Sequence, residues 1–506
     1  QGSLGHVEWL AATLRAGARV GVDGREMGLA AFRALTQALA PAGVALDIMA
    51  DPLGEIWQDR PPLPAAPVFE HLPPYATQSR AERLARVREA MARHKADVHL
   101  LCTLDDIAWV FNLRGSDVEY NPVFLAHALI GADHATLFVG EGKVSDALRA
   151  RLAEDGVDVA PYGHTAEALG SIEADQTLLI DPARVTCGVF HLMDPAVARV
   201  EAINPSTFFK SRKSDAELAH VRQAMAHDGA ALCEFFAWFE AAMAAGETVT
   251  ELDIDTHLTC ARARRPNYVS LSFSTIAAFN ANGAMPHYRA LPESHAVIEG
   301  DGLLLIDSGG QYLGGTTDIT RVVPVGTPSA DQKVDYTLVL KGMIALSRAA
   351  FPRGTPGPVL DAIARAPIWA GGAEYGHGTG HGVGYFLNVH EGPQVIAYRA
   401  MPLPHTAMEP GMITSNEPGI YRPGRWGVRI ENLTACRPWL SGELGEFLCF
   451  ETLTLCPIDT RCIDRDLMRP DEIDWLDDYH ATVRQRLLPL VSGAARDWLI
   501  ARTEPL

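Results

Sequence analysis

The sequence predicts a mixed α/β protein: two small α/β domains in series, followed by a larger α+β domain. Three observations support this fold class. Short strand-like and helical segments alternate up to about Lys210. A proline-rich stretch at residues 60–74 marks a domain boundary. Beyond Lys210 the helical segments become long, with strand-like segments between them. At about 150 residues per domain, 506 residues suffice for three hydrophobic cores.

The first domain is expected at residues 1–72. Residues 18–22 and 44–49 are strand-like, and apolar residues recur at helical spacing over 28–40. The chain begins with Gln1 and shows no charged segment followed by an apolar one, so we expect no signal peptide. The second domain, at residues 73–211, is expected to contain one charged amphipathic helix and three short strands, at residues 80–94, 97–102, 135–139 and 178–180.

The third domain is expected at residues 212–506. Ser214 opens a helix that runs to about Ala245, and Ser329 opens one that ends near Phe351. Each serine has a Glu or Gln three residues later, which is the capping-box pattern of a helix N-terminus. Strands are expected at residues 302–306, 317–323, 411–415 and 426–432.

The composition excludes several classes of function. The 62 acidic and 43 basic residues give a net charge of −19, which disfavours binding to nucleic acid. No apolar run approaches the roughly 18 residues that a membrane span needs. The eight cysteines are scattered without a CxxC pair, which indicates reduced thiols in a cytoplasmic protein.

Two aspartates border a predicted β-hairpin. Asp307 follows the apolar run at residues 303–306, and Asp318 follows a possible turn at residues 314–315. An antiparallel return would place both carboxylates on one face of the sheet. Each Asp alone is more often a turn residue or a solvated charge. In apolar surroundings, however, a buried carboxylate requires a cation or a proton.

A glycine-rich run at residues 376–384 contains two histidines four residues apart, His377 and His381. A helical zinc pair is excluded, because alternating glycines would break the helix and Gly378 stands where the HExxH motif needs Glu. A phosphate-binding loop is a weak alternative, because no strand–helix unit frames the run. We interpret the run as a glycine-rich strand or loop that lets the backbone approach a ligand and presents imidazoles.

Two further acids complete the candidate site. Glu417 precedes a Pro-Gly pair, and Glu431 lies in a predicted strand, where a salt bridge with Arg429 is the simpler interpretation. If gathered in one place, the four carboxylates carry four negative charges, which two divalent ions would balance. Oxygen-rich ligation favours Mn²⁺ or Mg²⁺, and a two-metal centre with a bridging hydroxide indicates metal-assisted hydrolysis. The candidate ligands are Asp307, Asp318, His381, Glu417 and Glu431.

These motifs resemble aminopeptidase P, the Xaa-Pro aminopeptidase group of the pita-bread metallopeptidases, in its long three-domain form. The resemblance covers nearly the whole chain. It rests on residues 106–109, 112–117, 282–288, 305–309, 316–321, 377–384, 388–393, 417–419, 429–432, 450–454, 475–476 and 479–480. It implies two creatinase-type N-terminal domains before a pita-bread catalytic domain. In the long form the first domain is about twice as long, so residues 1–72 are expected to be its latter half.

The resemblance also implies how the residues act. Asp307 would hold one metal ion, Asp318 and Glu431 would bridge both ions, and His381 and Glu417 would hold the other. Glu417 would also be the general base. The resemblance further implies that His390 steadies the tetrahedral intermediate. It implies that His287 and His377 shape the substrate site, that Arg429 orients the carboxylates and that Tyr421 supports them.

The implied activity is hydrolysis of the first peptide bond of substrates with proline in second position. The implied cofactors are two divalent ions, Mn²⁺ first, with Zn²⁺ or Co²⁺ open, and the implied assembly is a cytoplasmic homodimer. A prolidase, which cleaves Xaa-Pro dipeptides, shares the ligands and stays open as the nearest alternative. Methionine aminopeptidase lacks such N-terminal domains, and creatinase-type enzymes lack the full ligand set. A non-enzymatic pita-bread binding module stays open as the remote alternative, because the acidic charge would suit a basic partner.

Overall fold

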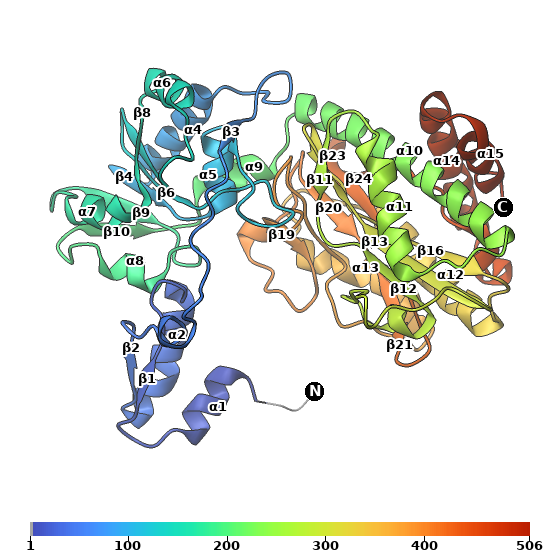
Figure 1. Cartoon of the computed structure of the whole chain (residues 1–506), viewed down its shortest axis with the longest axis horizontal. Helices are drawn as coiled ribbons and strands as arrows, with labels where there is room; N and C mark the ends of the chain where they lie inside the picture. Colours follow the sequence, from blue (N-terminus) through green and yellow to red (C-terminus); the bar gives the residue numbers. More distant parts are fainter. Residues whose placement is uncertain (1–3) are drawn as a thin grey trace. The chain divides into compact units, whose positions relative to one another are not determined.

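The computed structural model describes residues 4–506, which form two compact units (Figure 1). Unit 1 comprises residues up to 118 together with 123–208, and unit 2 comprises residues 119–122 and 209–506. The mixture of helix and strand confirms the predicted fold class. The predicted domain boundaries at 72/73 and 211/212 stay predictions, and the first three residues of the first predicted domain lie outside the described residues.

Unit 1 is built around a mixed sheet of six strands in the order β10-β9-β4-β6-β7-β8. A separate parallel pair, β1 and β2, and an antiparallel pair, β3 and β5, complete its strands. Its elements are α1 His6–Thr13, β1 Arg19–Gly21, α2 Leu29–Leu39, β2 Ala45–Asp47, α3 Pro52–Ile56, β3 Phe69–Glu70, α4 Arg80–Arg93, β4 Val98–Leu101, α5 Leu104–Val110, β5 Leu113–Arg114, β6 Ala126–Ile130, β7 Ala135–Val139, α6 Asp146–Glu154, β8 Val157–Pro161, α7 Thr165–Gly170, β9 Thr177–Ile180, α8 Cys187–His191 and β10 Ala198–Glu201; α9, Pro205–Ser211, follows.

A buried histidine in β4 makes the stability of unit 1 dependent on pH. The ring nitrogen Nδ1 of His99 donates a hydrogen bond to the Leu179 carbonyl oxygen at 3.0 Å. Burial lowers the pKa of His99 to about 4, whereas an unfolded chain has a His pKa of about 6.5. Between these pH values only the unfolded state binds the proton. Stability is therefore complete above pH 6.5 or so and is lost as the pH falls toward 4.

We expect His99→Leu to weaken this acid sensitivity. Between pH 7 and pH 5 the wild-type protein should lose about 2 kcal/mol of local unfolding free energy through His99, because each pKa unit is worth about 1.4 kcal/mol. The variant should lack that loss. Hydrogen–deuterium exchange of peptides covering β4 at both pH values measures it. Equal pH dependence in the two proteins would show that His99 does not carry the effect.

Unit 2 contains the long helices and most of the antiparallel strands. Its elements are α10 Asp215–Ala244, α11 Glu251–Ala263, β11 Tyr268–Leu271, β12 Ile276–Phe279, β13 Gly302–Ser308, β14 Gly310–Tyr312, β15 Gly315–Thr316, β16 Ile319–Val325, α12 Ala330–Ser347, β17 Ala350–Pro352, α13 Gly357–Ala370, β18 Gly380–Gly382, β19 Glu391–Ile396, β20 Ile413–Asn416, β21 Gly419–Arg422, β22 Trp426–Arg429, β23 Asn432–Gly442, β24 Gly445–Thr452, α14 Pro470–Leu487 and α15 Gly493–Arg502.

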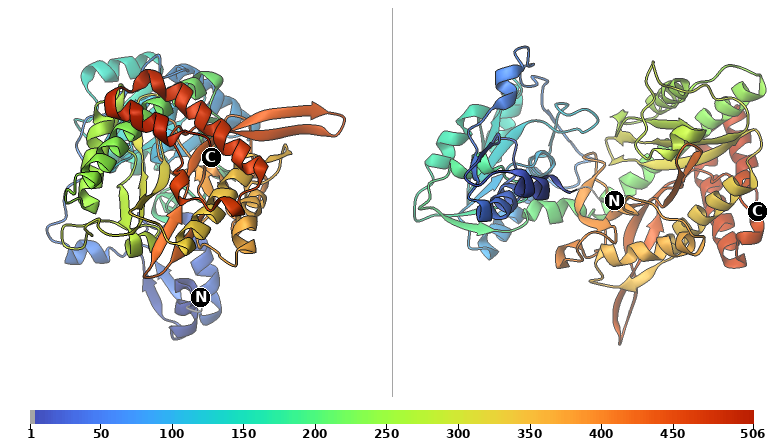
Figure 2. Two further views of the ribbon diagram at one scale, coloured as in Figure 1. Left: turned by 90° about the vertical axis from the view of Figure 1, so that its right-hand side faces the viewer. Right: turned by 90° about the horizontal axis from the view of Figure 1, so that it is seen from below.

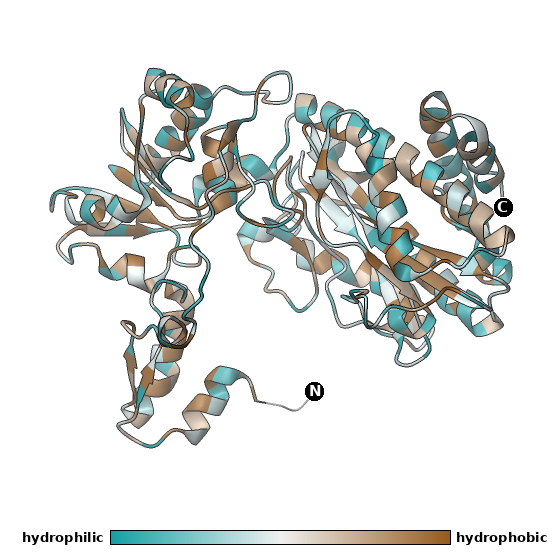
Figure 3. Ribbon diagram, viewed as in Figure 1, coloured by the Kyte–Doolittle hydropathy of each residue, from teal (hydrophilic) through white to brown (hydrophobic). Residues whose placement is uncertain are grey.

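Two sheets and the helices packed on them form the core of unit 2. One sheet has the order β12-β13-β16 and the other β17-β24-β23-β20-β18-β19. Helices α10, α11, α12, α14 and α15 contribute to one large hydrophobic cluster with the first sheet, whose strands β13 and β16 are rich in apolar residues (Figure 3). Ser214 caps α10 and Ser329 caps α12, each in a complete capping box, which confirms both predicted helix starts.

Two predicted elements differ from the structure. Helix α12 ends at Ser347 rather than near Phe351, because Phe351 lies in strand β17 and packs against Phe450 of β24. The single strand predicted at residues 426–432 is two strands. Strand β22 ends at Arg429 and pairs with β21, whereas β23 begins at Asn432 and pairs with β20 and β24. The chain therefore passes from one sheet to another at Ile430 and Glu431.

The ends of β23 and β24 form a hairpin that projects from the rest of unit 2 (Figure 2). Three large apolar residues near its tip, Trp439, Leu440 and Leu444, are 59%, 55% and 94% exposed. Within residues 4–506, none of the helices combines the length and the apolar character that crossing a membrane requires.

Candidate metal centre

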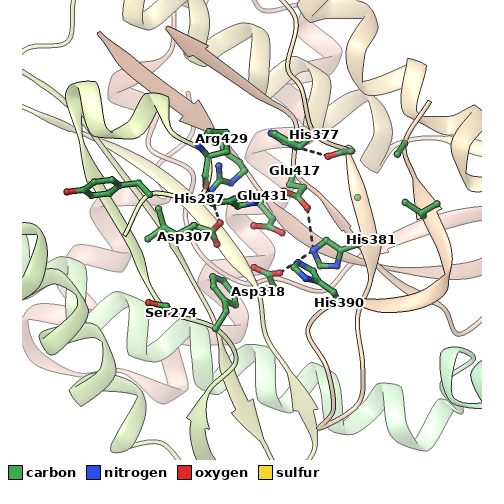
Figure 4. Close-up of a pocket in the computed structure, with 18 of the residues that line it drawn as sticks. Ser274, His287, Asp307, Asp318, His377, His381, His390, Glu417, Arg429 and Glu431 are labelled. Carbon is green, nitrogen blue, oxygen red and sulfur yellow. Dashed lines mark hydrogen bonds and ion pairs between the residues drawn. The ribbon is translucent and has the colours of Figure 1, made fainter. Parts of the chain in front are cut away.

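A cavity of about 560 Å³ lies in unit 2. Figure 4 shows carboxylates and imidazoles converging on it from strands and from the segments that adjoin strands. The structure brings all nine predicted site residues to its wall: Asp307, Asp318, His381, Glu417, Glu431, His287, His377, His390 and Arg429. Their individual roles stay predictions.

Strand register explains why the two aspartates share a face. In the β13–β16 ladder Asp307 lies opposite Thr320, and in the continuing β14–β15 hairpin Tyr312 lies opposite Gly315. The turn is thus one residue earlier than the sequence predicted. When the turn shifts by one residue, the residue that lies opposite Asp307 changes by two positions. Because side chains alternate along a strand, the residue opposite Asp307 still points to the same face of the sheet. Asp307 and Asp318 therefore both reach the cavity.

The glycine-rich run contains a short strand, β18, and not a helix. A Cβ atom on Gly380 would lie 2.0 Å from the Ser415 carbonyl oxygen, and one on Gly382 would lie 2.3 Å from that of Glu391. These glycines therefore allow close approach of strands β20 and β19. Gly378 and Gly380 also line the cavity, and the approach of this backbone to a ligand stays a prediction. His381, between Gly380 and Gly382, directs its ring at the carboxylates (Figure 4).

His381 presents a lone pair to two carboxylates. Its Nδ1 lies 2.9 Å from the Gly382 carbonyl oxygen, which can only accept, so Nδ1 carries the proton. Burial, with the neighbouring His390, lowers the pKa of His381 to about 3, so the ring is neutral and Nε2 has no proton. This Nε2 lies 3.4 Å from Glu417 Oε1 and 3.6 Å from Asp318 Oδ2. Three electron-rich atoms at this spacing are suited to share a cation or a proton.

Glu417 follows the end of strand β20. Its Oε1 accepts a hydrogen bond from the Ser415 hydroxyl at 3.0 Å, and the Ser415 Oγ accepts one from the His381 backbone N–H at 2.9 Å. Ser415 thus holds Glu417 and His381 in register. The sequence predicts no function for Ser415, although its position two residues before Glu417 places it on the same side of an extended chain.

The contacts of Glu431 differ from the predicted salt bridge with Arg429. Arg429 does not pair with it directly, because Arg429 Nη2 donates to Asp307 Oδ2 at 2.6 Å. The link instead runs through Thr320, whose hydroxyl donates to Glu431 Oε2 at 2.8 Å and accepts from Arg429 Nε at 3.1 Å. Thr320 had no predicted role. Thr320 lies two residues after Asp318 in a predicted strand, and this spacing indicates that both side chains point to the same face.

Arg429 also contacts a second part of the cavity wall through Tyr421. Its Nη1 donates to the Tyr421 hydroxyl at 2.8 Å, and that hydroxyl lies 2.8 Å from His377 Nε2. Burial lowers the pKa of His377 to about 4. A neutral His377 therefore accepts the Tyr421 proton at Nε2, while its Nδ1 donates to the Gly378 carbonyl oxygen. One arginine connects an aspartate ligand candidate to an imidazole of the wall.

The carboxylates raise one another's pKa values. Burial first, and then Asp307 and Glu417, raise the pKa of Asp318 well above its ordinary value. Burial, and then Asp318 and Glu417, do the same for Glu431. Burial raises the pKa of Glu417 to about 8, against the opposing effect of Arg429 and with a further rise from Asp307. Carboxylates that repel one another in a buried site are stabilised by a shared proton or by a cation.

The donor set fits two divalent ions. Arg429 offsets one of the four negative charges, and three remain, one more than a single divalent ion can neutralise. Asp307 Oδ1 and Glu431 Oε1 are buried without a hydrogen-bond partner in the described part of the chain. Ligand atoms of Asp318, His381 and Glu431 lie within 4.8 Å of one another. Four carboxylates and one imidazole are ligands for Mn²⁺, Co²⁺ or Zn²⁺.

Comparison with known proteins identifies the family of the chain. Three family models match the chain: the creatinase/prolidase N-terminal domain at residues 59–217, metallopeptidase family M24 at 219–438 and the C-terminal region of peptidase M24 at 446–506. A probable Xaa-Pro aminopeptidase P of Laccaria bicolor is 39% identical, over 96% of this chain and 77% of the relative.

Solved structures show the same relationship. The X-prolyl aminopeptidase of Caenorhabditis elegans, described as a cytosolic enzyme with a di-nuclear active site, aligns with a TM-score of 0.95 and 31% identity over 100% of this chain and 83% of that one. The Xaa-Pro dipeptidase of Bacillus anthracis aligns with a TM-score of 0.57 and 25% identity over 75% of this chain and 99% of that one. The chain therefore belongs to metallopeptidase family M24, in its aminopeptidase P branch.

Proposed function

We propose that the protein is a dinuclear-metal aminopeptidase that hydrolyses the first peptide bond of substrates with proline in second position. The observation that carries the proposal is the buried group of four carboxylates around the unprotonated Nε2 of His381. Two divalent ions held by Asp307, Asp318, His381, Glu417 and Glu431 would lower the pKa of a bound water and polarise the scissile carbonyl. We propose Mn²⁺ as the native metal, since most of the ligands are carboxylates.

The protein's own groups supply the remaining steps. A carboxylate oxygen of Glu417 accepts the proton of the attacking water as general base and can return it to the prolyl nitrogen that leaves. The neutral imidazole of His390 donates to the oxygen that gains negative charge. Arg429 holds Asp307 in place, and the cavity walls near His287 and His377 contact the proline ring. A free α-amino group of the substrate meets the acidic group, which restricts attack to the first bond.

Substrate specificity tests this proposal. The Xaa-Pro bond is a tertiary amide without an N–H, so discrimination must come from the shape of the ring and the groups around it. In an Mn²⁺-supplemented assay we expect Arg-Pro-Pro to be cleaved at its first bond, Arg-Ala-Pro poorly and N-acetylated Arg-Pro-Pro hardly at all. Comparable turnover of Arg-Ala-Pro would contradict the assignment.

The same assay separates the aminopeptidase from a prolidase. We expect a higher kcat/KM for Arg-Pro-Pro than for the dipeptide Arg-Pro, and a clear preference for Arg-Pro would favour the prolidase. Support for the aminopeptidase comes from the alignment, which extends over all of this chain for the X-prolyl aminopeptidase and over 75% for the dipeptidase. A binding module without enzymatic activity would carry no stoichiometric metal.

Location and assembly form part of the proposal. The eight cysteines are free in the structure, which supports a reducing, cytoplasmic location. The exposed apolar residues on the projecting β23–β24 hairpin (Figure 2) support a homodimer, because exposed apolar side chains of this size commonly mark protein contacts. Sedimentation equilibrium of the intact chain tests the dimer.

A further inference from the structure

A buried ion-pair group lies behind the cavity wall and has no part in the chemistry described above. Its members are Lys213, Lys210 and Glu391, whose side chains are 1%, 2% and 0% exposed. Lys213 Nζ donates to Glu391 Oε1 at 2.5 Å, and Lys210 Nζ lies 3.2 Å from Glu391 Oε2. Charges this deeply buried are costly unless each is paired. The group therefore calls for a structural or functional explanation.

Lys213 joins the two segments that carry the active-site imidazoles. Besides Glu391, its Nζ donates to the Val383 carbonyl oxygen at 2.6 Å and to the Ser211 carbonyl oxygen at 3.4 Å, which uses all three of its N–H groups. Val383 lies two residues after His381, and Glu391 directly follows His390. A single ammonium group thus ties the end of β18 to the start of β19.

The imidazoles of His381 and His390 are close together, so the contacts of Lys213 affect their relative position. The rings of His381 and His390 lie 4.3 Å apart between centroids, at 87° to each other. Both point toward the same carboxylates (Figure 4). Gly382 and Glu391 are also partners in the β18–β19 ladder, but the register shifts between His381 and Gly382, so the ladder is irregular beside His381. The charged contacts of Lys213 and Glu391 add a second constraint at this irregularity.

We propose that Lys213 and Glu391 are positioning residues that fix the His390 imidazole relative to His381. The proposal rests on the proposed function, because it gives His390 its role in peptide hydrolysis. Neither Lys213 nor Glu391 lines the cavity, so both act through His390. Outer partners of this kind are typically worth about 10–100-fold in activity or metal affinity.

A double-mutant cycle with fully metal-loaded enzyme tests this inference. Glu391→Gln should lower kcat for Arg-Pro-Pro by about 10–100-fold, with metal content unchanged. In a His390→Ala background the same substitution should lower kcat little further, because the group it positions is gone. An equal factor in both backgrounds would overturn the proposal, since a general loss of structure would act in both.

A matched control is Glu472→Gln. Glu472 is also a buried glutamate, 3% exposed, paired with a lysine, Lys341, at 2.6 Å, and it does not line the cavity. Its substitution should leave kcat close to the wild-type value even if the melting temperature falls. If Glu391→Gln does not fold, the double variant Lys213→Met/Glu391→Gln removes both charges of the strongest pair, and the same cycle applies to it.

A readout independent of turnover separates this inference from the proposed function. The rate of diethyl pyrocarbonate modification at His390, followed by peptide mass spectrometry, should change in Glu391→Gln and stay constant in Glu472→Gln. An unchanged rate in Glu391→Gln would overturn the positioning role. Absence of Arg-Pro-Pro cleavage by the wild-type protein, with the modification rate altered as expected, would instead overturn the proposed function alone.

Discussion

Asp318→Asn is expected to abolish peptide hydrolysis and to reduce the bound metal from two ions per chain. Asp318 lies 3.6 Å from His381 Nε2 and shares the cavity with three further carboxylates. As the proposed bridge, it would hold both ions, so a neutral amide at this position weakens both at once. The rate should fall by several orders of magnitude, because the metal-assisted step is lost. Elemental analysis and a steady-state assay measure the two effects.

The stability of the metal-free protein distinguishes an effect of Asp318→Asn on metal binding from an effect on folding. Burial and neighbouring carboxylates raise the pKa of Asp318, so the folded state binds its proton more tightly than the unfolded chain does. Stability of metal-free wild type is therefore lost as the pH rises through that raised pKa. Asn carries no charge, so in EDTA at pH 8 the variant should melt no lower than the wild type. With Mn²⁺ the wild type should be the more stable, by mass action.

Asp459→Asn is the matched control. Asp459 is likewise buried, 5% exposed, but its carboxylate pairs with Arg461 and does not line the cavity. This variant should keep two ions and near-normal turnover. At most one ion in fully active wild-type enzyme, or full activity of Asp318→Asn, would contradict the bridging assignment.

The sequence predicts that Asp307 and Asp318 share a face, and this prediction holds even when the turn between them is placed one residue off. Local antiparallel pairing fixes side-chain faces by parity, and parity survives a turn placed one residue off. Asp307 and Asp318 could therefore be paired correctly although the turn lies at Leu313 and Gly314 rather than at residues 314–315. The capping boxes at Ser214 and Ser329 were predictable for a similar reason, because three residues of sequence contain the whole interaction.

Non-local contacts account for what the sequence could not predict. Thr320 reaches Glu431 across 111 residues, and Lys213 reaches Glu391 across 178. No periodicity encodes such contacts, because they depend on which strands become neighbours. The same limit explains the error at Glu431. Arg429 and Glu431 are adjacent on one face of a continuous strand, but the chain changes sheets between them and turns Arg429 toward Asp307.

Glu417→Gln is expected to lower kcat by about 10²–10⁴-fold while the protein still binds metal. Gln keeps an oxygen that can serve as a ligand and accept the Ser415 hydroxyl hydrogen bond, but it cannot take a proton. Burial raises the pKa of the Glu417 carboxyl to about 8 in the absence of metal. Bound cations would lower that pKa and keep the carboxylate ionised, so that it can accept a proton at the working pH.

A Mn²⁺ titration distinguishes whether Glu417 acts as the general base or only as a metal ligand. If Glu417 only held metal, saturating Mn²⁺ would restore kcat in Glu417→Gln, and that recovery would contradict the general-base role. If Glu417 accepts the proton, kcat stays low at full metal occupancy, because added metal cannot replace the missing acceptor. Glu409→Gln serves as control, since Glu409 pairs with Arg353 and does not line the cavity. A near-normal kcat for fully loaded Glu417→Gln would assign the base to another group, and the imidazole of His390 is a candidate because it faces the same carboxylates (Figure 4).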